Sequence, residues 1–370
     1  MIFSAHSLRG DISRFDTAEV TRKFQAIAEQ PRPTPTAAAT GPEISIPLTT
    51  VSEAGTFDAY LTIGFKGSSA TQALVVDSGN STLIVPYWED IQTNPAYTAL
   101  GTATEPWGCP AKIVKGPIVI TTTSNTIYTI DDCVFYACTG GARTANFGLG
   151  CITPWSVSGW NLPAGIAAPM QAPLSYDTTN PFVEIQYAAA EDLHADNGQL
   201  TVDSQSILTL YRSKPAGYTI LNIIKDLEWM SVRPQSFSVG STTTPWPGPD
   251  KAIAMVDTGG GPVYLSDPDG YVYKSVWPDP VACPDWSQSS TNCTCTSDKI
   301  GMTLTDGVNS YSFTIDTTGL PTSVQGLTAV MCEKNAYMME QYGMNIGGIS
   351  ALFNDLLIDY RNAQVGFMAR

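Results

Sequence analysis

Histidine, basic residues and long apolar runs are scarce in this sequence, and each scarcity argues against a class of function. The 370 residues contain two histidines. A Ser-His-Asp or Cys-His triad in the body of the chain would need His194, because His6 lies in an N-terminal extension. His194 belongs to a polar stretch, residues 191–196, where we expect a solvated side chain. Acid/base chemistry is therefore left to the carboxylates.

Positive charge is also scarce. Lys and Arg number 19 against 34 Asp and Glu, which gives a net charge of −15, whereas a nucleic-acid-binding surface needs a basic footprint. No apolar run approaches the length that crosses a bilayer. Phosphate-binding glycine loops of the P-loop or dinucleotide type are missing too. We expect no nucleic-acid partner and no membrane span.

Metal-ligand patterns are missing as well. Since no Cys-x-x-Cys pair occurs and histidine is nearly absent, we expect no metal and no cofactor. The cysteines divide evenly between the two halves of the chain, which favours disulfides closed within each half, with reduced thiols as the alternative. The eight are Cys109, Cys133, Cys138 and Cys151, then Cys283, Cys293, Cys295 and Cys332.

The N-terminus shows no charged segment followed by an apolar core, so no signal peptide is visible. Either a signal peptide was removed, or the protein is not exported by that route. The cysteine count favours secretion or another oxidising compartment, and the missing signal leaves the cytoplasm open.

The composition indicates a chain rich in strands and turns. It has 31 Gly, 26 Pro and 43% apolar residues, and short apolar segments alternate with turn residues. The length suits two lobes, so we predict an all-β fold of two related lobes. The clearest predicted strands cover residues 57–65, 73–76, 83–87, 118–123, 126–130, 134–137, 252–256, 300–304 and 311–315.

Three further segments have distinctive patterns. Residues 300–304 and 311–315 predict a hairpin turning at Asp306-Gly307. Residues 181–193 are predicted as helix. Residues 345–367 predict a glycine turn, a short helix and two strands.

The domain boundaries follow from these patterns. Residues 1–45 form an extension with a predicted helix at 17–29, which opens on a capping box, and a Pro-rich linker. The predicted N-terminal lobe covers residues 46–205 and the C-terminal lobe residues 206–370.

One carboxylate stands out in the N-terminal half. Asp77 follows an apolar run and is itself followed by Ser78, Gly79 and a second apolar run. A carboxylate at the end of a buried strand is penalised by desolvation unless a second group pairs with it. The sequence therefore predicts a partner for Asp77.

The second half repeats the same pattern at Asp257, with Thr258 and Gly259 after it. Two adjacent carboxyls cannot both ionise cheaply and share one proton. The deprotonated member would activate a water molecule while the protonated member polarises a carbonyl. The Ser78 and Thr258 hydroxyls are predicted to bond across to the other lobe, and the glycines allow the backbone to approach the carboxylates.

Over residues 46–370 the sequence resembles the pepsin-like aspartic protease family. The resemblance implies a bilobal all-β fold with a cleft between the lobes, endopeptidase activity on extended peptides, and Asp77 and Asp257 as the catalytic pair. It also places residues 1–45 where such enzymes carry a zymogen prosegment. The motifs that carry it are Asp77-Ser78-Gly79 with residues 83–86, Asp257-Thr258-Gly259, Phe147-Gly148-Leu149-Gly150, residues 59–65 and residues 346–367.

The sequence departs from the family pattern in its active-site loops and flap. Asn80 stands where the family usually has a Ser that bonds the catalytic carboxyl, and Gly260 stands where it usually has a hydroxyl residue. The family's Tyr-Gly-x-Gly flap tip is missing; the nearest equivalent is Trp107-Gly108, so we expect a reduced flap.

These features lead to an expected function and two alternatives. The first is an aspartic endopeptidase, active at acidic pH as a monomer on peptide or protein substrates. The alternatives are a catalytically silent protein that binds a peptide, protein or other ligand, and an acid/base catalyst acting on a non-peptide substrate.

Overall fold

The computed structural model describes residues 44–150 except 54–55, 106–107 and 141–144; residues 182–277 except 197–198, 203, 225–229, 248–251, 261–262 and 268–269; residues 293–295; residues 299–333 except 319 and 321–329; and residues 343–370. The predicted helix at 17–29 lies outside these ranges, as does the rest of the extension up to residue 43. In the described ranges no helix has the length and apolarity needed to span a membrane.

Strands make up most of the described structure. Those before residue 212 are β1 (Ile44–Glu53), β2 (Thr56–Phe65), β3 (Thr71–Asp77), β4 (Leu83–Val85), β5 (Thr98–Thr104), β6 (Pro110–Thr121), β7 (Ile127–Cys138), β8 (Asn146–Gly148), β9 (Phe182–Gln186), β10 (Leu193–Asp196), β11 (Gln199–Val202) and β12 (Ser206–Tyr211).

The later strands are β13 (Thr219–Asn222), β14 (Ser231–Val239), β15 (Thr242–Pro245), β16 (Ile253–Met255), β17 (Tyr264–Ser266), β18 (Cys293–Cys295), β19 (Lys299–Thr305), β20 (Ser310–Asp316), β21 (Val330–Glu333), β22 (Gly343–Asn345), β23 (Asn354–Asp359) and β24 (Gln364–Ala369). The described helices are short: η2 (Trp88–Asp90), η3 (Ala190–Asp192), α4 (Tyr271–Val276) and η6 (Gly348–Leu352).

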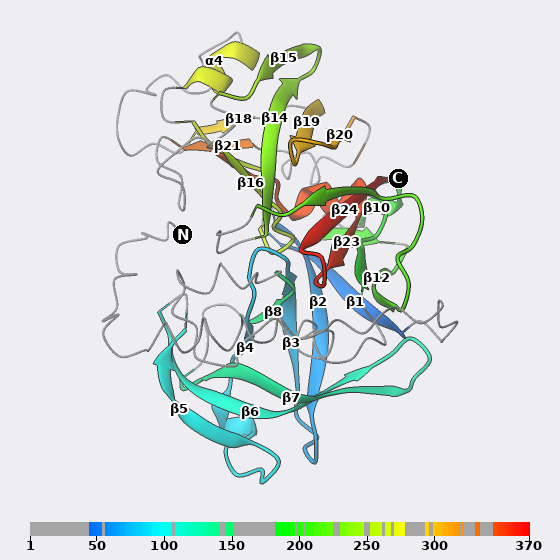
Figure 1. Ribbon diagram of the computed structural model, residues 1–370. Helices are drawn as coiled ribbons and strands as arrows, with labels where there is room; N and C mark the ends of the chain where they lie inside the picture. Colours follow the sequence, from blue (N-terminus) through cyan, green and yellow to red (C-terminus); the bar gives the residue numbers. More distant parts are fainter. Residues whose placement is uncertain are drawn as a thin grey trace.

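Two large sheets organise these strands. A 13-stranded sheet has the order β13-β24-β23-β9-β12-β1-β2-β3-β8-β4-β7-β6-β5. A 9-stranded sheet has the order β18-β21-β17-β22-β16-β14-β19-β20, with β15 beside β14. In Figure 1 the second sheet lies at the top and β5, β6 and β7 lie at the bottom, with β23, β24 and β12 between them.

The C-terminal strands belong to the sheet that the N-terminal strands build. β23 pairs antiparallel with β9, and β12 pairs antiparallel with β1. Through β9 and β12, the strands at the end of the chain join the same sheet as β1. The predicted boundary at residue 205 stays a prediction.

Alternation of apolar and polar residues explains the hairpin of β19 and β20. Tyr311, Phe313 and Ile315 are buried in the core while Ser312 and Thr314 between them are exposed, as expected for strands with one buried face. The strands join at the predicted turn. The predicted turn, short helix and two strands of the C-terminus correspond to Gly347, η6, β23 and β24.

The prediction of a helix at residues 181–193 is wrong. These residues form strand β9, the 3-10 turn η3 and the start of β10. Val183 and Ile185 are buried on one face, and Glu184 is buried on the other, where Tyr211 and Tyr218 donate hydrogen bonds to its carboxylate. Burial on both faces hides the two-residue period that marks a strand.

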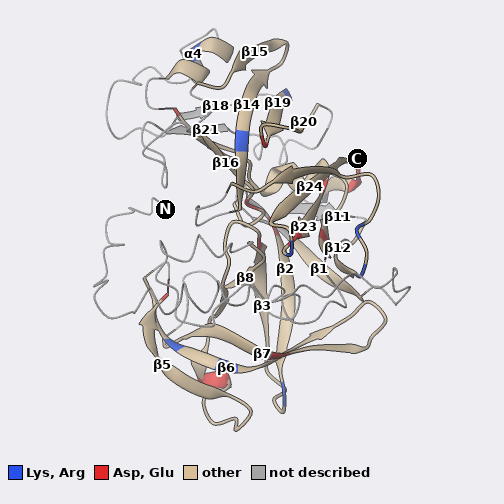
Figure 2. Ribbon diagram, in the orientation of Figure 1, with Lys and Arg blue, Asp and Glu red and all other residues tan. Residues whose placement is uncertain are grey.

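Charged residues are spread thinly over the described strands. Figure 2 shows the basic segments scattered over strands and loops. His194 is exposed in β10. The core beneath is apolar and includes residues of the strands β3, β4 and β8 that adjoin the Asp77 loop.

Candidate active site

Asp77 ends strand β3 and is 7% exposed. Its Oδ1 accepts hydrogen bonds from the backbone N–H groups of Gly79 (2.7 Å) and Asn80 (3.0 Å). Its Oδ2 accepts a bond of 2.6 Å from Asn146 Nδ2. The apolar strand thus delivers the carboxylate into a turn whose amides hold one oxygen while a side chain holds the other.

Asp257 is held in a similar way two residues after β16. Its Oδ1 accepts the Gly259 N–H at 3.0 Å, and its Oδ2 accepts Asn345 Nδ2 at 2.6 Å. Unlike Asp77, Asp257 is only half-buried. The two aspartates predicted to form a pair therefore have matching surroundings, with one fewer backbone donor at Asp257.

The two loops meet through their glycines. A Cβ atom placed on Gly79 would lie 2.6 Å from Cγ of Asp257, and one placed on Gly259 would lie 2.5 Å from Cγ of Asp77. Real Cβ atoms do not approach other atoms this closely, so only glycine fits at both positions. Each glycine thereby lets its loop reach the carboxyl of the opposite loop.

The hydroxyl residues lock the loops together. Ser78 N–H donates to Thr258 Oγ1 (3.0 Å), which donates to Val76 O (2.9 Å). Reciprocally, Thr258 N–H donates to Ser78 Oγ (3.0 Å), which donates to Val256 O (2.9 Å). Both hydroxyls are fully buried. The structure therefore contains the bonds across the two halves that the sequence pattern predicts.

The motif Phe147-Gly148-Leu149-Gly150 supports the Asp77 loop from below. Leu149 N–H donates to Asp77 O and Gly150 N–H donates to Asn80 O, both at 2.7 Å. β8, which carries the start of this motif, pairs in parallel with β3 and places Gly148 opposite Asp77. The backbone of the Asp77 turn is fixed on both sides.

Asn146 and Asn345 were not singled out by the sequence analysis, although both bond a carboxylate of the pair. The available signal was a repeat: Asn146-Phe147-Gly148 in one half and Asn345-Ile346-Gly347 in the other. Asn-apolar-Gly is ordinary turn composition, so the repeat gains meaning only once both copies are known to lie beside an aspartate.

The two departures from the family pattern, Asn80 and Gly260, lie beside the contacts that hold the two carboxylates. The Asn80 side chain donates to Asn146 Oδ1 (2.8 Å) and to Thr82 O (2.9 Å) instead of contacting the carboxylate. A Cβ atom at Gly260 would lie 2.8 Å from Asp257 Oδ2. Neither position supplies a side-chain donor to the pair.

The expected flap region is only partly described. Trp107 lies outside the described residues. Gly108 is exposed, has a φ of +92°, and lies in the turn that joins β5 to β6, where its N–H donates to Glu105 O (2.9 Å). Glu105 also accepts the Cys109 N–H through its side chain (2.7 Å). Hydrogen bonds between the end of β5 and the start of β6 therefore close this hairpin.

The surroundings of Asp77 raise its pKa well above the usual value of an aspartic acid. Burial is the largest cause, and the negative charge of Asp257 is the next. The bond from Asn146 and the backbone bond from Asn80 act in the opposite direction, because they stabilise the carboxylate. Two carboxyls that interact this closely titrate as a pair.

Three of the cysteines expected to form disulfides form none in the described structure. Cys109, Cys133 and Cys138 are buried and unbridged. Burial raises the pKa of the Cys133 and Cys138 thiols to about 12. The described part of the chain therefore gives no support to the predicted disulfides in its first half; the side chains of the other cysteines lie outside it.

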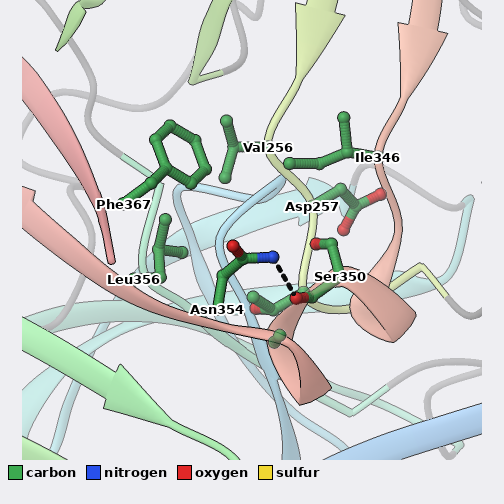
Figure 3. Close-up of a pocket in the computed structure, with 9 residues that line it drawn as sticks. Val256, Asp257, Ile346, Ser350, Asn354, Leu356 and Phe367 are labelled. Atoms are coloured by element: carbon green, nitrogen blue, oxygen red, sulfur yellow. Dashed lines mark hydrogen bonds between the residues drawn. The ribbon is translucent and has the colours of Figure 1, made fainter. Parts of the chain in front are cut away.

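A small pocket borders the site between the Asp257 loop and the strands β23 and β24 (Figure 3). Val256 and Asp257 line it together with Leu356 and Phe367 from β23 and β24. Its polar neighbours are already bonded: Ser350 Oγ donates to Gly347 O, and the dashed line in Figure 3 marks the bond from Asn354 Nδ2 to Ser350 O. The pocket is a packing gap beside the Asp257 loop.

Comparison with known proteins is informative at the level of fold. No family model and no curated protein matches the chain. Among solved structures, the crystal structure of an aspartic proteinase from Irpex lacteus matches with a TM-score of 0.60 over 89% of this chain and 97% of that chain, at 13% sequence identity. The chain therefore has the all-β fold of the pepsin-like aspartic proteases.

Proposed function

We propose that the chain is an aspartic endopeptidase that hydrolyses peptide bonds between its two lobes at acidic pH. Asp77 and Asp257 are its catalytic residues, held by Ser78, Gly79, Thr258 and Gly259. The observation that carries the proposal is the reciprocal placement of Gly79 against the Asp257 carboxyl and of Gly259 against the Asp77 carboxyl. This placement brings two carboxyls from the two halves of the chain to one point.

The chemistry follows from one shared proton. The deprotonated carboxylate removes a proton from a water molecule as the water oxygen attacks the scissile carbonyl carbon, while the protonated carboxyl donates a hydrogen bond to the carbonyl oxygen. The resulting tetrahedral intermediate collapses when the C–N bond breaks and a dyad proton passes to the leaving nitrogen. The raised pKa of Asp77 supports this division, because it keeps a proton on the pair in mild acid.

The hydrogen bonds that the two carboxylates accept favour a catalyst over a silent binder. The silent alternative was suggested by the loss of a side-chain donor at Asn80 and Gly260. Each carboxylate nevertheless accepts a side-chain bond of 2.6 Å, from Asn146 and from Asn345. In the proposal the substrate is an extended peptide, the β5–β6 hairpin with Gly108 covers it, and the protein acts as a monomer.

The test is digestion of an unfolded protein substrate at a series of pH values between about 3 and 6. Wild type is compared with Asp77→Asn, Asp257→Asn and, as the matched control, Asp131→Asn, which changes an exposed aspartate on β7. We expect wild type and Asp131→Asn to cleave and the other two variants to lose cleavage. Equal, near-zero cleavage by all four folded proteins would overturn the proposal and favour the silent binder.

A further inference from the structure

Asn146 and Asn345 occupy equivalent positions in the two halves. β8 pairs in parallel with β3 and places Asn146 opposite Val75, two residues before Asp77. β22 pairs in parallel with β16 and places Asn345 opposite Met255, two residues before Asp257. Each asparagine then donates a bond of 2.6 Å from Nδ2 to Oδ2 of the nearby aspartate. The same contact is built twice on the same strand register.

The orientation of each amide is fixed by a second bond. Asn80 Nδ2 donates to Asn146 Oδ1 at 2.8 Å, and Gly347 N–H donates to Asn345 Oδ1 at 2.9 Å. With the oxygen of each amide taken as an acceptor, its nitrogen must face the carboxylate. Asn80 therefore acts on Asp77 through Asn146.

We propose that Asn146 and Asn345 are the positioning residues of the Asp77–Asp257 pair, supplying the side-chain donors that positions 80 and 260 do not supply. The proposal rests on the proposed function and extends it to residues outside the two Asp-hydroxyl-Gly loops.

The chemical effect follows from the donor. The Nδ2 group of an asparagine donates and cannot accept, so the lone pair of Oδ2 that faces each amide stays free of the shared proton. The proton is left to the remaining lone pairs of the two carboxyls. A neutral donor to a carboxylate also favours its charged form, which opposes the effects of burial and of the neighbouring negative charge.

Few other groups affect the protonation of the Asp77–Asp257 pair. Among the described residues, Tyr187 also interacts with both aspartates, and its hydroxyl donates to Thr258 O at 3.1 Å. Burial raises the pKa of Tyr187, so it stays neutral in acid. Asp58 acts on Tyr187 and is not among the groups that shift Asp77.

The test uses Asn146→Ala and Asn345→Ala in the full chain. The control is Asn222→Ala, which removes an amide-to-carboxylate bond of similar length, 2.7 Å to Asp306, from the exposed surface. Two quantities are measured: the pH dependence of kcat/KM on a peptide, and the titration of the aspartate carboxyl carbons by NMR after selective 13C labelling. The second measurement needs no activity.

We expect each of the two variants to raise an apparent pKa of the pair by about one unit, a tenfold change in proton affinity, and to lower kcat more than it raises KM. Asn222→Ala should leave both measurements at the wild-type values. If Asn146→Ala does not fold, Asn345→Ala, at a half-buried position, decides the question. Unchanged titration in the folded variants would overturn the positioning role, even if activity falls.

The two proposals fail in different ways. If wild type cleaves peptides and the variants titrate like wild type, the protease stands and the positioning role falls. If wild type cleaves nothing while the carboxyl titrations shift as expected, the positioning role at the pair stands and the proposed peptidase activity falls.

Discussion

Gly260 lies so close to Asn345 that a Cβ atom on residue 260 would be 3.2 Å from Asn345 Nδ2, besides lying 2.8 Å from Asp257 Oδ2. A side chain at position 260 and the Asn345 amide therefore compete for one place beside the carboxylate. The glycine at 260 and the asparagine at 345 are two parts of one arrangement.

Gly260→Ala should consequently impair the protein instead of restoring a family-like site. The added methyl must displace the Asp257 carboxylate or the Asn345 amide, and overpacking of this kind costs about 1–3 kcal/mol. We expect kcat/KM to fall by about tenfold or more. The measurement is steady-state cleavage of a peptide, together with the melting temperature.

The control for this variant is Gly101→Ala in β5, where an added Cβ would meet nothing within 4 Å. It should keep the wild-type kcat/KM. Unimpaired cleavage by Gly260→Ala would show that the space around Asp257 is looser than the structure indicates.

The sequence predicted the central part of the site because its signal is local. Asp77 and Asp257 each lie between apolar runs and are followed by a hydroxyl residue and glycine, and that order alone implies a buried turn with a carboxylate. The asparagines were missed because their role depends on strand pairing. Asn146 and Asn345 reach the aspartates only through the parallel pairs β3–β8 and β16–β22, which join residues far apart in the chain.

The same limit explains the error at residues 181–193. β9 is an interior strand between β12 and β23, so Val183, Glu184 and Ile185 are all buried. Glu184 is accommodated there by tyrosine hydroxyls from β12 and from the segment before β13. Those partners follow from the tertiary fold and not from the local pattern.

The hydrogen bonds between the Ser78 loop and the Thr258 loop should contribute measurably to the free energy of unfolding. Thr258→Val removes the donor to Val76 O and the acceptor of the Ser78 N–H, which leaves two buried backbone groups unpaired at a cost of about 1–3 kcal/mol each. Ser78→Ala should act similarly through Val256 O. Denaturant unfolding monitored by tryptophan fluorescence gives the free energies of unfolding.

A surface hydroxyl pair provides the comparison for these variants. Thr303 and Ser312 bond at 2.9 Å on the exposed side of β19 and β20. Thr303→Val should change the free energy of unfolding by less than about 0.5 kcal/mol. An equally small effect for Thr258→Val would mean that the buried bonds are replaced by other partners when they are removed.

The buried thiols predict slow alkylation of the native protein. Because Cys133 and Cys138 are almost fully buried and have pKa values of about 12, they present little thiolate to a reagent at about pH 8. We expect iodoacetamide to modify neither residue before unfolding and both after unfolding without reductant, as counted by peptide mass spectrometry. Modification that requires a reductant would instead show that these cysteines are bridged.

The raised pKa of Asp77 also predicts how stability varies with pH. An acid whose pKa is higher in the folded than in the unfolded state binds its proton more tightly when folded, so stability falls as pH rises from the unfolded value toward the folded one. The unfolded value for Asp is about 3.9. Asp77→Asn cannot ionise at this position, so it does not lose this stability. The free energy of unfolding of the variant minus that of wild type should therefore increase above about pH 4, and it should become constant once the wild-type pair has ionised. Urea unfolding at a series of pH values measures this difference. The control is Asp131→Asn, for which we expect no such increase. A difference for Asp77→Asn that does not change with pH would mean that the Asp77 pKa is not raised in the folded protein.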